Sequence, residues 1–131
     1  MIKDPTPRPR AAVVDDDLSF REAICGLLSL LGLDVTPYSS AESILDEDDL
    51  SRYGVFLLDI QMPGLSGFDL QDRLQARGVR APVIFISSQT DDATRDRAES
   101  SSALALLGKP FQSDELIALL KTALPPDWRP E

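Results

Sequence analysis

The stretch Val55-Phe56-Leu57-Leu58-Asp59 decides how this chain folds. Four consecutive apolar residues, with no polar residue between them, are typical of a strand that is covered on both faces of a sheet. The run ends on a carboxylate, and the turn-forming pair Pro63-Gly64 follows shortly after it. The pattern therefore predicts a buried strand that delivers the Asp59 side chain onto a loop.

Four further segments are predicted to be strands, at residues 11–14, 33–38, 82–86 and 103–107. Between the first two, apolar residues recur at helical spacing and stop at Gly32; they are Phe20, Ile24, Leu27, Leu28 and Leu31. Ser39 with Glu42 resembles a capping box that opens a short second helix, and a third helix is expected at residues 67–76. We expect Ser113 to cap the last helix, whose buried stripe is Leu116, Ile117, Leu120 and Leu124.

Strand and helix alternate five times along the chain. This alternation predicts an α/β fold, namely a doubly wound, five-stranded parallel sheet with helices on both faces and right-handed crossovers. Pro37 favours an edge position for the strand at residues 33–38, because proline cannot donate to a central ladder. In such a sheet the polar residues that follow the strands gather along one edge.

The length and composition are those of one globular domain. The chain has 131 residues, 43% of them hydrophobic and 27% charged. Its net charge of −9 argues against direct binding of nucleic acid or of an anionic membrane surface. It has no apolar run approaching the roughly 18 residues of a membrane span, so we expect a cytoplasmic protein. It contains no histidine, which excludes histidine catalysis and histidine-ligated zinc.

We expect residues 10–124 to form the domain, between a flexible arm at residues 1–9 and a tail at residues 125–131. Trp128 in that tail is expected to be loosely packed, and a contact with a partner is the alternative. Residues 90–102 should form the fourth helix, but their only apolar residues are Ala93 and Ala98. Because two alanines bury little surface, we predict a helix that is short, displaced or mobile. The alternative is an ordinary solvated helix with an unusual surface.

Five polar residues should meet at the carboxyl edge of the sheet: Asp15, Asp16, Asp59, Ser87 and Lys109. Two carboxylates about 4 Å apart repel each other by about 4 kcal/mol at a protein surface, so three of them need a cation or a proton. Oxygen ligands without histidine or cysteine select a hard ion, and a few carboxylates with water suit Mg²⁺ better than Ca²⁺. The sequence therefore predicts a magnesium site.

A metal beside a free carboxylate, a lysine and a hydroxyl is suited to phosphoryl transfer. In this hypothesis Asp59 is the nucleophile, Asp15 and Asp16 bind the metal, Lys109 neutralises phosphoryl oxygens, and Ser87 donates a hydrogen bond to them. Taken singly, each residue has a plainer interpretation: a turn with Asp17 as a helix cap, a loop aspartate, a strand-end hydroxyl and a solvated lysine. Their joint position at neighbouring strand ends favours the site.

The chain resembles the receiver domain of bacterial two-component response regulators over residues 10–124. The stretches that carry the resemblance are Val13-Val14-Asp15-Asp16-Asp17, Leu57-Leu58-Asp59-Ile60-Gln61-Met62-Pro63-Gly64-Leu65-Ser66-Gly67, Pro82-Val83-Ile84-Phe85-Ile86-Ser87-Ser88 and Gly108-Lys109-Pro110-Phe111. It implies a flavodoxin-like sheet in the order 2-1-3-4-5 and a cis peptide between Lys109 and Pro110. It also implies Mg²⁺ bound by Asp16, Asp59 and the Gln61 carbonyl with Asp15 nearby, and a phosphohistidine donor on a sensor histidine kinase.

The chain departs from this family at the position three before the lysine. Family members usually carry an aromatic residue there, whose rotamer reports phosphorylation, whereas this chain has Leu106. Gln61 and Gln89 occupy the positions where family members tune loss of the phosphoryl group. Since neither amide can act as a general base, we predict that hydrolysis depends on unassisted or partner-assisted attack by water.

The function predicted from the sequence is a phosphorylation switch that acts through protein binding, without turnover of a separate substrate. An aspartyl phosphatase is disfavoured, because such an enzyme needs a second acid where this chain has Gln61. A receiver-like interaction module that is never phosphorylated is the other alternative. The residues after 124 are too few for a DNA-binding domain, so the chain is either a stand-alone regulator or the excised receiver of a longer protein. The absence of a charged or flexible linker after Trp128 favours the stand-alone regulator. The target, and whether the phosphorylated form makes a homodimer, stay open.

Overall fold

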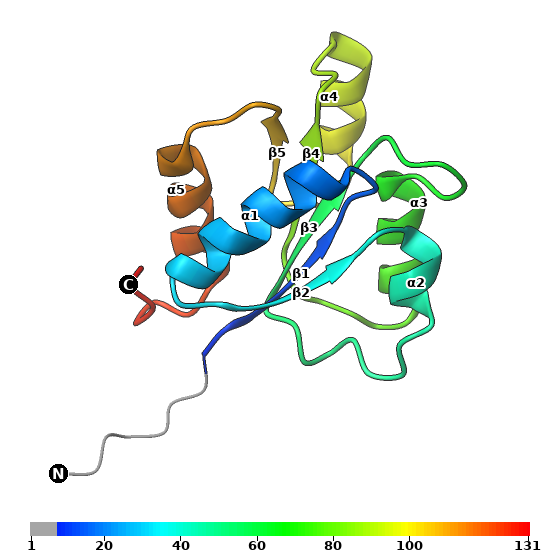
Figure 1. The fold of residues 1–131 in the computed structure, drawn as a ribbon. Coiled ribbons are helices and arrows are strands. Elements are labelled where there is room, and N and C mark those ends of the chain that lie inside the picture. Colours follow the sequence, from blue (N-terminus) through cyan, green and yellow to red (C-terminus); the bar gives the residue numbers. More distant parts are fainter. Residues whose placement is uncertain (1–7) are drawn as a thin grey trace, which may run out of the picture.

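The computed structural model describes residues 8–131, so most of the predicted arm at residues 1–9 lies outside the described residues. Strands and helices alternate along this part of the chain (Figure 1). The order is β1 (Arg10–Val14), α1 (Leu18–Leu30), β2 (Asp34–Tyr38), α2 (Ala41–Leu45), β3 (Val55–Asp59), α3 (Gly67–Ala76), β4 (Val83–Ser87), α4 (Asp92–Ser100), β5 (Ala105–Gly108) and α5 (Ser113–Ala123). None of these helices is long and apolar enough to cross a membrane.

The strands form one parallel sheet in the order β2-β1-β3-β4-β5, as the resemblance implied. In Figure 1, α1 and α5 lie on one side of the sheet, and α2 and α3 lie on the other. β2 is an edge strand, so Pro37 occupies the position predicted for it. All five residues of the central strand β3 are buried, which explains its unbroken apolar run.

The sheet divides the hydrophobic core into two clusters. One cluster fills the space beneath α2, α3 and α4 and includes Phe56, Leu70 and Phe85, all fully buried. The other lies beneath α1 and α5 and includes Leu28 and Leu116. Because alternate residues of the strands point to opposite faces, β1 and β3 contribute to both clusters.

Two predicted helix starts are wrong by one residue. Ser40 caps α2, because its extended backbone lets its hydroxyl accept from the amide of Ser43 at 3.1 Å. Glu42 is not part of a capping box and instead accepts from the amide of Leu65 at 3.5 Å. At α5 the residue before the first turn is Gln112, whose main-chain amide donates to the Glu115 carboxylate at 3.1 Å. Ser113, the predicted cap, already belongs to the helix.

The last strand begins two residues later than predicted. β5 starts at Ala105, since the amide of Ala103 donates to the Ser101 hydroxyl at 3.2 Å and that residue belongs to the preceding turn.

The segment with few apolar residues does form a helix, α4, in which Ala98 alone is buried. Arg97 of this helix lies over the Phe68 ring, with its guanidinium carbon 4.3 Å from the ring centre. Mobility of α4 stays a prediction.

The tail does not have the loose packing predicted for it. Trp128 is only 9% exposed and belongs to the core cluster beneath α1 and α5. Its amide donates to the carbonyl of Pro125 at 2.9 Å, and the amide of Glu131 donates to the carbonyl of Leu31 at 3.3 Å. The indole therefore fills apolar space that the helices leave open at that end of the domain.

Candidate functional site

Three carboxylates meet at the carboxyl edge of the sheet. β1 and β3 are parallel neighbours with Val14 opposite Leu58, so the residues that follow them lie side by side. Asp15, Asp16 and Asp59 each place an oxygen within 4.8 Å of the others. Asp15 and Asp59 are buried and Asp16 is exposed. The predicted acidic site is therefore assembled, with one side open to solvent.

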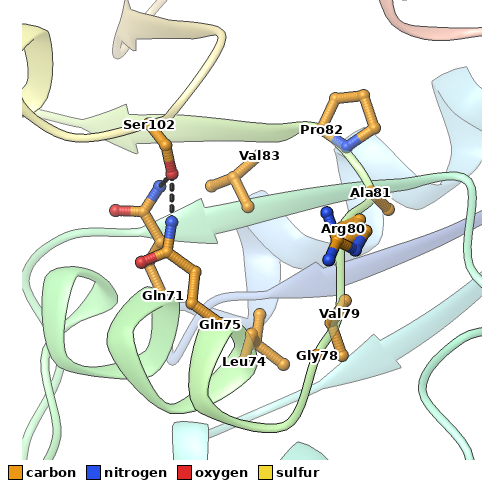
Figure 2. Close-up of a pocket in the computed structure, with 10 residues that line it drawn as sticks. All are labelled: Gln71, Leu74, Gln75, Gly78, Val79, Arg80, Ala81, Pro82, Val83 and Ser102. Carbon is orange, nitrogen blue, oxygen red and sulfur yellow. Dashed lines mark hydrogen bonds between the residues drawn. The ribbon is translucent and has the colours of Figure 1, made fainter.

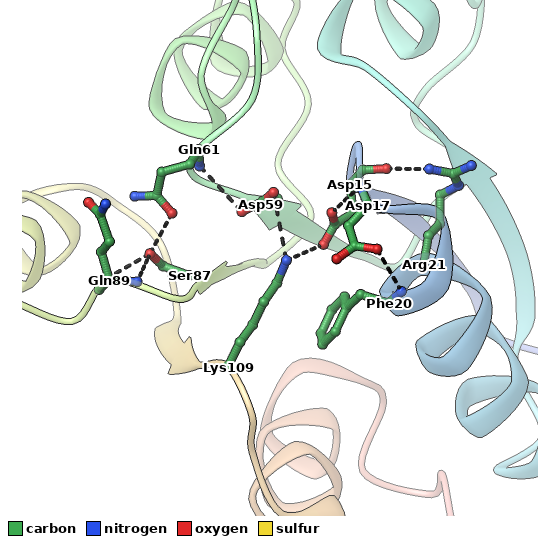
Figure 3. Close-up of polar contacts among 9 residues, drawn as sticks. All are labelled: Asp15, Asp17, Phe20, Arg21, Asp59, Gln61, Ser87, Gln89 and Lys109. Carbon is green, nitrogen blue, oxygen red and sulfur yellow. Dashed lines mark hydrogen bonds and ion pairs between the residues drawn. The ribbon is translucent and has the colours of Figure 1, made fainter.

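Lys109 follows β5 and brings its ammonium group into this cluster (Figure 3). Its Nζ lies 2.7 Å from Asp15 Oδ2 and 3.7 Å from Asp59 Oδ2. Asp15 Oδ2 is buried and accepts no hydrogen bond among the described residues, so this ion pair is its partner. The peptide between Lys109 and Pro110 is cis, as the resemblance implied.

The electrostatics of Asp59 reflect this crowding. Burial and the neighbouring Asp15 carboxylate raise the pKa of Asp59 to about 7, and the Lys109 ammonium opposes that rise only in part. Charging all three acids leaves two negative charges beyond what one ammonium neutralises. A donor set of carboxylate oxygens alone, with Asp16 open to solvent, fits a hard divalent cation that keeps some of its water.

Ser87 lies at the end of β4, fully buried, and its hydroxyl is already engaged. Ser87 Oγ lies 2.7 Å from Gln61 Oε1 and 2.7 Å from the carbonyl of Gln89, and it accepts from the Gln89 amide at 2.9 Å. A hydroxyl has one proton, so the two acceptors compete for it. Gln61 thus contacts Ser87 through its side chain and Gln89 contacts it through main-chain atoms. The main chain also joins Ser87 to Lys109, whose amide donates to its carbonyl at 2.7 Å.

The remaining predicted positions lie around this centre. The amide of Gln61 donates to Asp59 Oδ1 at 3.3 Å, while its carbonyl as a metal ligand stays a prediction. Leu106 pairs with Phe85 across β4 and β5, and it is half-buried against the core cluster beneath α4. It also lines a small hollow between α4 and β5. An aliphatic side chain therefore occupies the position where the family usually has a ring.

Three residues near the site have roles that the sequence did not reveal. Arg21 donates to the carbonyl of Asp15 at 2.6 Å and so holds the end of β1. The Phe20 ring lies under the ammonium of Lys109, 4.2 Å from its Nζ. A side chain on Gly67 would put its Cβ 2.5 Å from the carbonyl oxygen of Asp59. Gly67 lies within the quoted family motif, whereas the helical spacing of Phe20 suggested only a core residue.

Asp17 has the plain role considered for it. Its carboxylate accepts from the amide of Phe20 at 3.2 Å and caps α1. The three acids after β1 therefore have two different roles. Asp15 and Asp16 belong to the acidic cluster, and Asp17 caps the helix. The cap sets the position of the first turn of α1, from which Phe20 and Arg21 reach the site.

A separate hollow lies at the opposite, amino end of β4 (Figure 2). Gln71 and Gln75 of α3 both donate to the hydroxyl of Ser102 there, the first at 3.5 Å. Gln71 is only 3% exposed. These side-chain amides join α3 to the turn between α4 and β5. The polar groups that line the hollow therefore have a structural role.

Comparison with known proteins gives consistent matches over most of the chain. The model of the response regulator receiver domain matches residues 11–121. The transcriptional regulatory protein TdiR of Thauera aromatica is 36% identical over 112 residues, which are 86% of this chain and 49% of TdiR. FixJ of Bradyrhizobium diazoefficiens is 30% identical over 119 residues, which are 91% of this chain and 58% of FixJ. The chain spans about half the length of the curated relatives it matches.

Solved structures agree with this match. The response regulator StyR superposes with a TM-score of 0.81 and 34% identity, over 90% of this chain and 60% of StyR. TrrA of Thermotoga maritima, solved in complex with Mg²⁺ and BeF, gives 0.77 and 27%, over 88% of this chain and 99% of TrrA. The chemotaxis protein CheY4 of Vibrio cholerae gives 0.79 at 23% identity over 90% of this chain and 100% of CheY4, which shows the fold alone.

Proposed function

The chain belongs to the response regulator receiver domain family, and on that premise we propose that it is a phosphorylation switch with Asp59 as the phosphoacceptor. The observation that carries the proposal is the position of Lys109, whose ammonium lies within reach of both Asp15 and Asp59, with Asp16 as the third, exposed acid of the cluster. A carboxylate nucleophile beside a fixed cation is the arrangement that phosphoryl transfer to aspartate needs.

In the proposed reaction an oxygen of Asp59 attacks the phosphorus of a phosphohistidine on a sensor histidine kinase. The bond between phosphorus and the histidine nitrogen breaks, and that nitrogen keeps the electron pair and takes up a proton. Lys109 neutralises charge on the phosphoryl oxygens, and Ser87 turns its hydroxyl toward them. Water later attacks the acyl phosphate and releases inorganic phosphate, and the amides of Gln61 and Gln89 cannot act as bases in that step.

By the pattern of this family, Asp16, Asp59 and the Gln61 carbonyl of this chain would hold Mg²⁺, with Asp15 nearby. Bound Mg²⁺ would supply positive charge for the phosphoryl oxygens that Lys109 alone does not neutralise. The protein's own residues position the acids: Arg21 fixes the backbone of Asp15, and the end of β3 presents Asp59 to the donor.

The product state would signal through protein contacts. An acyl phosphate adds up to about two negative charges at the sheet edge and would increase the population of an active conformation. The net charge of −9 favours a protein partner over nucleic acid for this segment. We place the reaction in the cytoplasm, without turnover of a separate substrate. An aspartyl phosphatase is disfavoured, because the position that would need an acid is Gln61, engaged with Ser87.

Incubation with a small acyl phosphate and Mg²⁺ tests the proposal. We expect a mass increase of one phosphoryl group that disappears in Asp59→Asn. Steady hydrolysis of a phosphate ester would instead indicate a phosphatase. No mass change and no turnover would indicate an interaction module that is not phosphorylated.

A further inference from the structure

We propose that Phe20 is a positioning residue, whose ring holds the Lys109 ammonium between Asp15 and Asp59. This inference rests on the proposed function and adds to it a residue outside the quoted family stretches. The proposed role is to position the Lys109 ammonium group, because the ring touches no reacting atom.

The geometry is that of a cation above an aromatic face. Lys109 Nζ lies 4.2 Å from the centre of the Phe20 ring, within the roughly 6 Å over which a ring attracts an ammonium group. The lysine side chain is only 16% exposed. Removal of water strengthens this attraction, so the burial makes the contact more than a surface coincidence. Figure 3 shows the ring on the side of the ammonium away from Asp59.

The ring itself is held in place from two directions. The amide of Phe20 donates to the Asp17 carboxylate at the start of α1, which fixes the backbone. Its ring meets the Phe111 ring edge to face, with centres 6.0 Å apart and planes at 77°. Phe20 is therefore held in one position. Lys109 has a flexible four-carbon stem, and contact with a fixed ring restricts where its ammonium group lies.

The contact with the Phe20 ring matters because Asp15 and Asp59 compete for the same ammonium group. Lys109 Nζ lies closer to Asp15, at 2.7 Å, than to Asp59, at 3.7 Å. To stabilise a phosphoryl group on Asp59, the ammonium must loosen its short contact with Asp15. The ring face attracts an ammonium group within roughly 6 Å of its centre, so the ring can hold the cation through a shift of this size. An aliphatic residue would fill the same space without favouring a charge there.

Ring fluorination separates this role from simple packing, since fluorine withdraws the negative charge of the ring face while the shape hardly changes. We would replace Phe20 by phenylalanines with one, two and three ring fluorines in the full chain. Phe111 provides the matched control, because it belongs to the same aromatic pair and its ring makes no cation contact among the described residues. The readout is the rate of phosphoryl adduct formation from a small acyl phosphate with Mg²⁺.

We expect the rate to fall with each fluorine at position 20, by about two- to tenfold at three fluorines, and to stay level at position 111. Phe20→Tyr should keep the rate and Phe20→Leu should lower it, with thermal unfolding confirming that both fold. A flat series at position 20, or equal slopes at both positions, would overturn the positioning role. If the unmodified protein forms no adduct, the proposed function fails and this inference with it. An adduct with a flat series removes the inference alone.

Discussion

The Ser87 hydroxyl and the Gln61 side chain are joined by a contact of 2.7 Å, which occupies the group expected to bind the phosphoryl oxygens. Before it can bind them, Ser87 must give up this partner or the equally close carbonyl of Gln89. The contact therefore stabilises the unphosphorylated arrangement. It joins the hydroxyl predicted to bind the phosphoryl group with a side chain at a position where the family tunes loss of that group.

Replacing Gln61 by alanine should remove one of the two acceptors that hold the Ser87 hydroxyl and so favour the phosphorylated arrangement. A hydrogen bond contributes about 0.5–1.5 kcal/mol net, so we expect beryllofluoride, a phosphoryl mimic, to bind about two- to tenfold more tightly in the presence of Mg²⁺. Titration calorimetry would measure this. Gln89→Ala is the control, because Gln89 contacts Ser87 through main-chain atoms that the substitution keeps. Equal affinities in the wild type and Gln61→Ala would show that the contact does not restrain Ser87.

Gly67→Ala should destabilise the fold at the phosphorylation loop. Its Cβ would lie 2.5 Å from the carbonyl oxygen of Asp59 and 3.0 Å from Cα of Ile60, so the backbone next to Asp59 must move. We expect a loss of about 1–3 kcal/mol in the free energy of unfolding, together with slower adduct formation. Urea denaturation measures the first effect and mass spectrometry the second. Unchanged stability would show that the loop yields without cost.

Gly26→Ala should have the opposite effect on stability. Gly26 lies inside α1, where a Cβ would meet no atom of residues 8–131 within 4 Å beyond its chain neighbours and its own helix backbone. Glycine is less favourable than alanine in a helix interior, so we expect a gain of about 0.5–1 kcal/mol in the free energy of unfolding. Urea denaturation alongside Gly67→Ala compares a glycine that the structure requires with one that it does not. A loss of stability in Gly26→Ala would contradict this.

The parts of the fold that the sequence predicted are those set by local pattern. The apolar run before Asp59 predicted a strand covered on both faces, which β3 is, and α3 has the predicted bounds. Both predictions depend on residues close in sequence. The acids, Ser87 and Lys109 could be grouped in advance because parallel strands end at one edge.

The features that were missed depend on tertiary contacts. Ser39 and Ser40 are both good cap residues, and the choice between them depends on which one is extended where β2 turns into α2. Phe20 has the spacing of a core residue, and its second role depends on a lysine from the far end of the chain. The tail has no periodicity, so nothing local predicts that Trp128 is buried.

Mg²⁺ should stabilise the wild type through Asp16 and not through Asp17. A ligand at 100 times its dissociation constant adds about 2.7 kcal/mol to the free energy of unfolding, which a thermal shift detects. We expect Asp16→Ala to lose most of this shift, because its carboxylate belongs to the acidic cluster. Asp17→Ala should keep the shift while losing about 1 kcal/mol of stability, since Asp17 caps α1. Equal Mg²⁺ shifts in the two variants would argue against the assigned site.

Trp128→Ala should destabilise the whole domain rather than release a free tail. The indole is 9% exposed and packs with the core beneath α1 and α5, so its removal leaves a cavity. We expect a loss of about 2–4 kcal/mol in the free energy of unfolding, slightly below the usual cost of removing a fully buried tryptophan. Urea denaturation followed by circular dichroism measures it, because the variant has no other tryptophan to report by fluorescence. Arg129→Ala is the matched control in the same segment. Its guanidinium donates to the tail carbonyls of Pro126 and Trp128, and its replacement should change stability by less than about 0.5 kcal/mol. Similar small losses in both variants would mean that the tail docks without supporting the core.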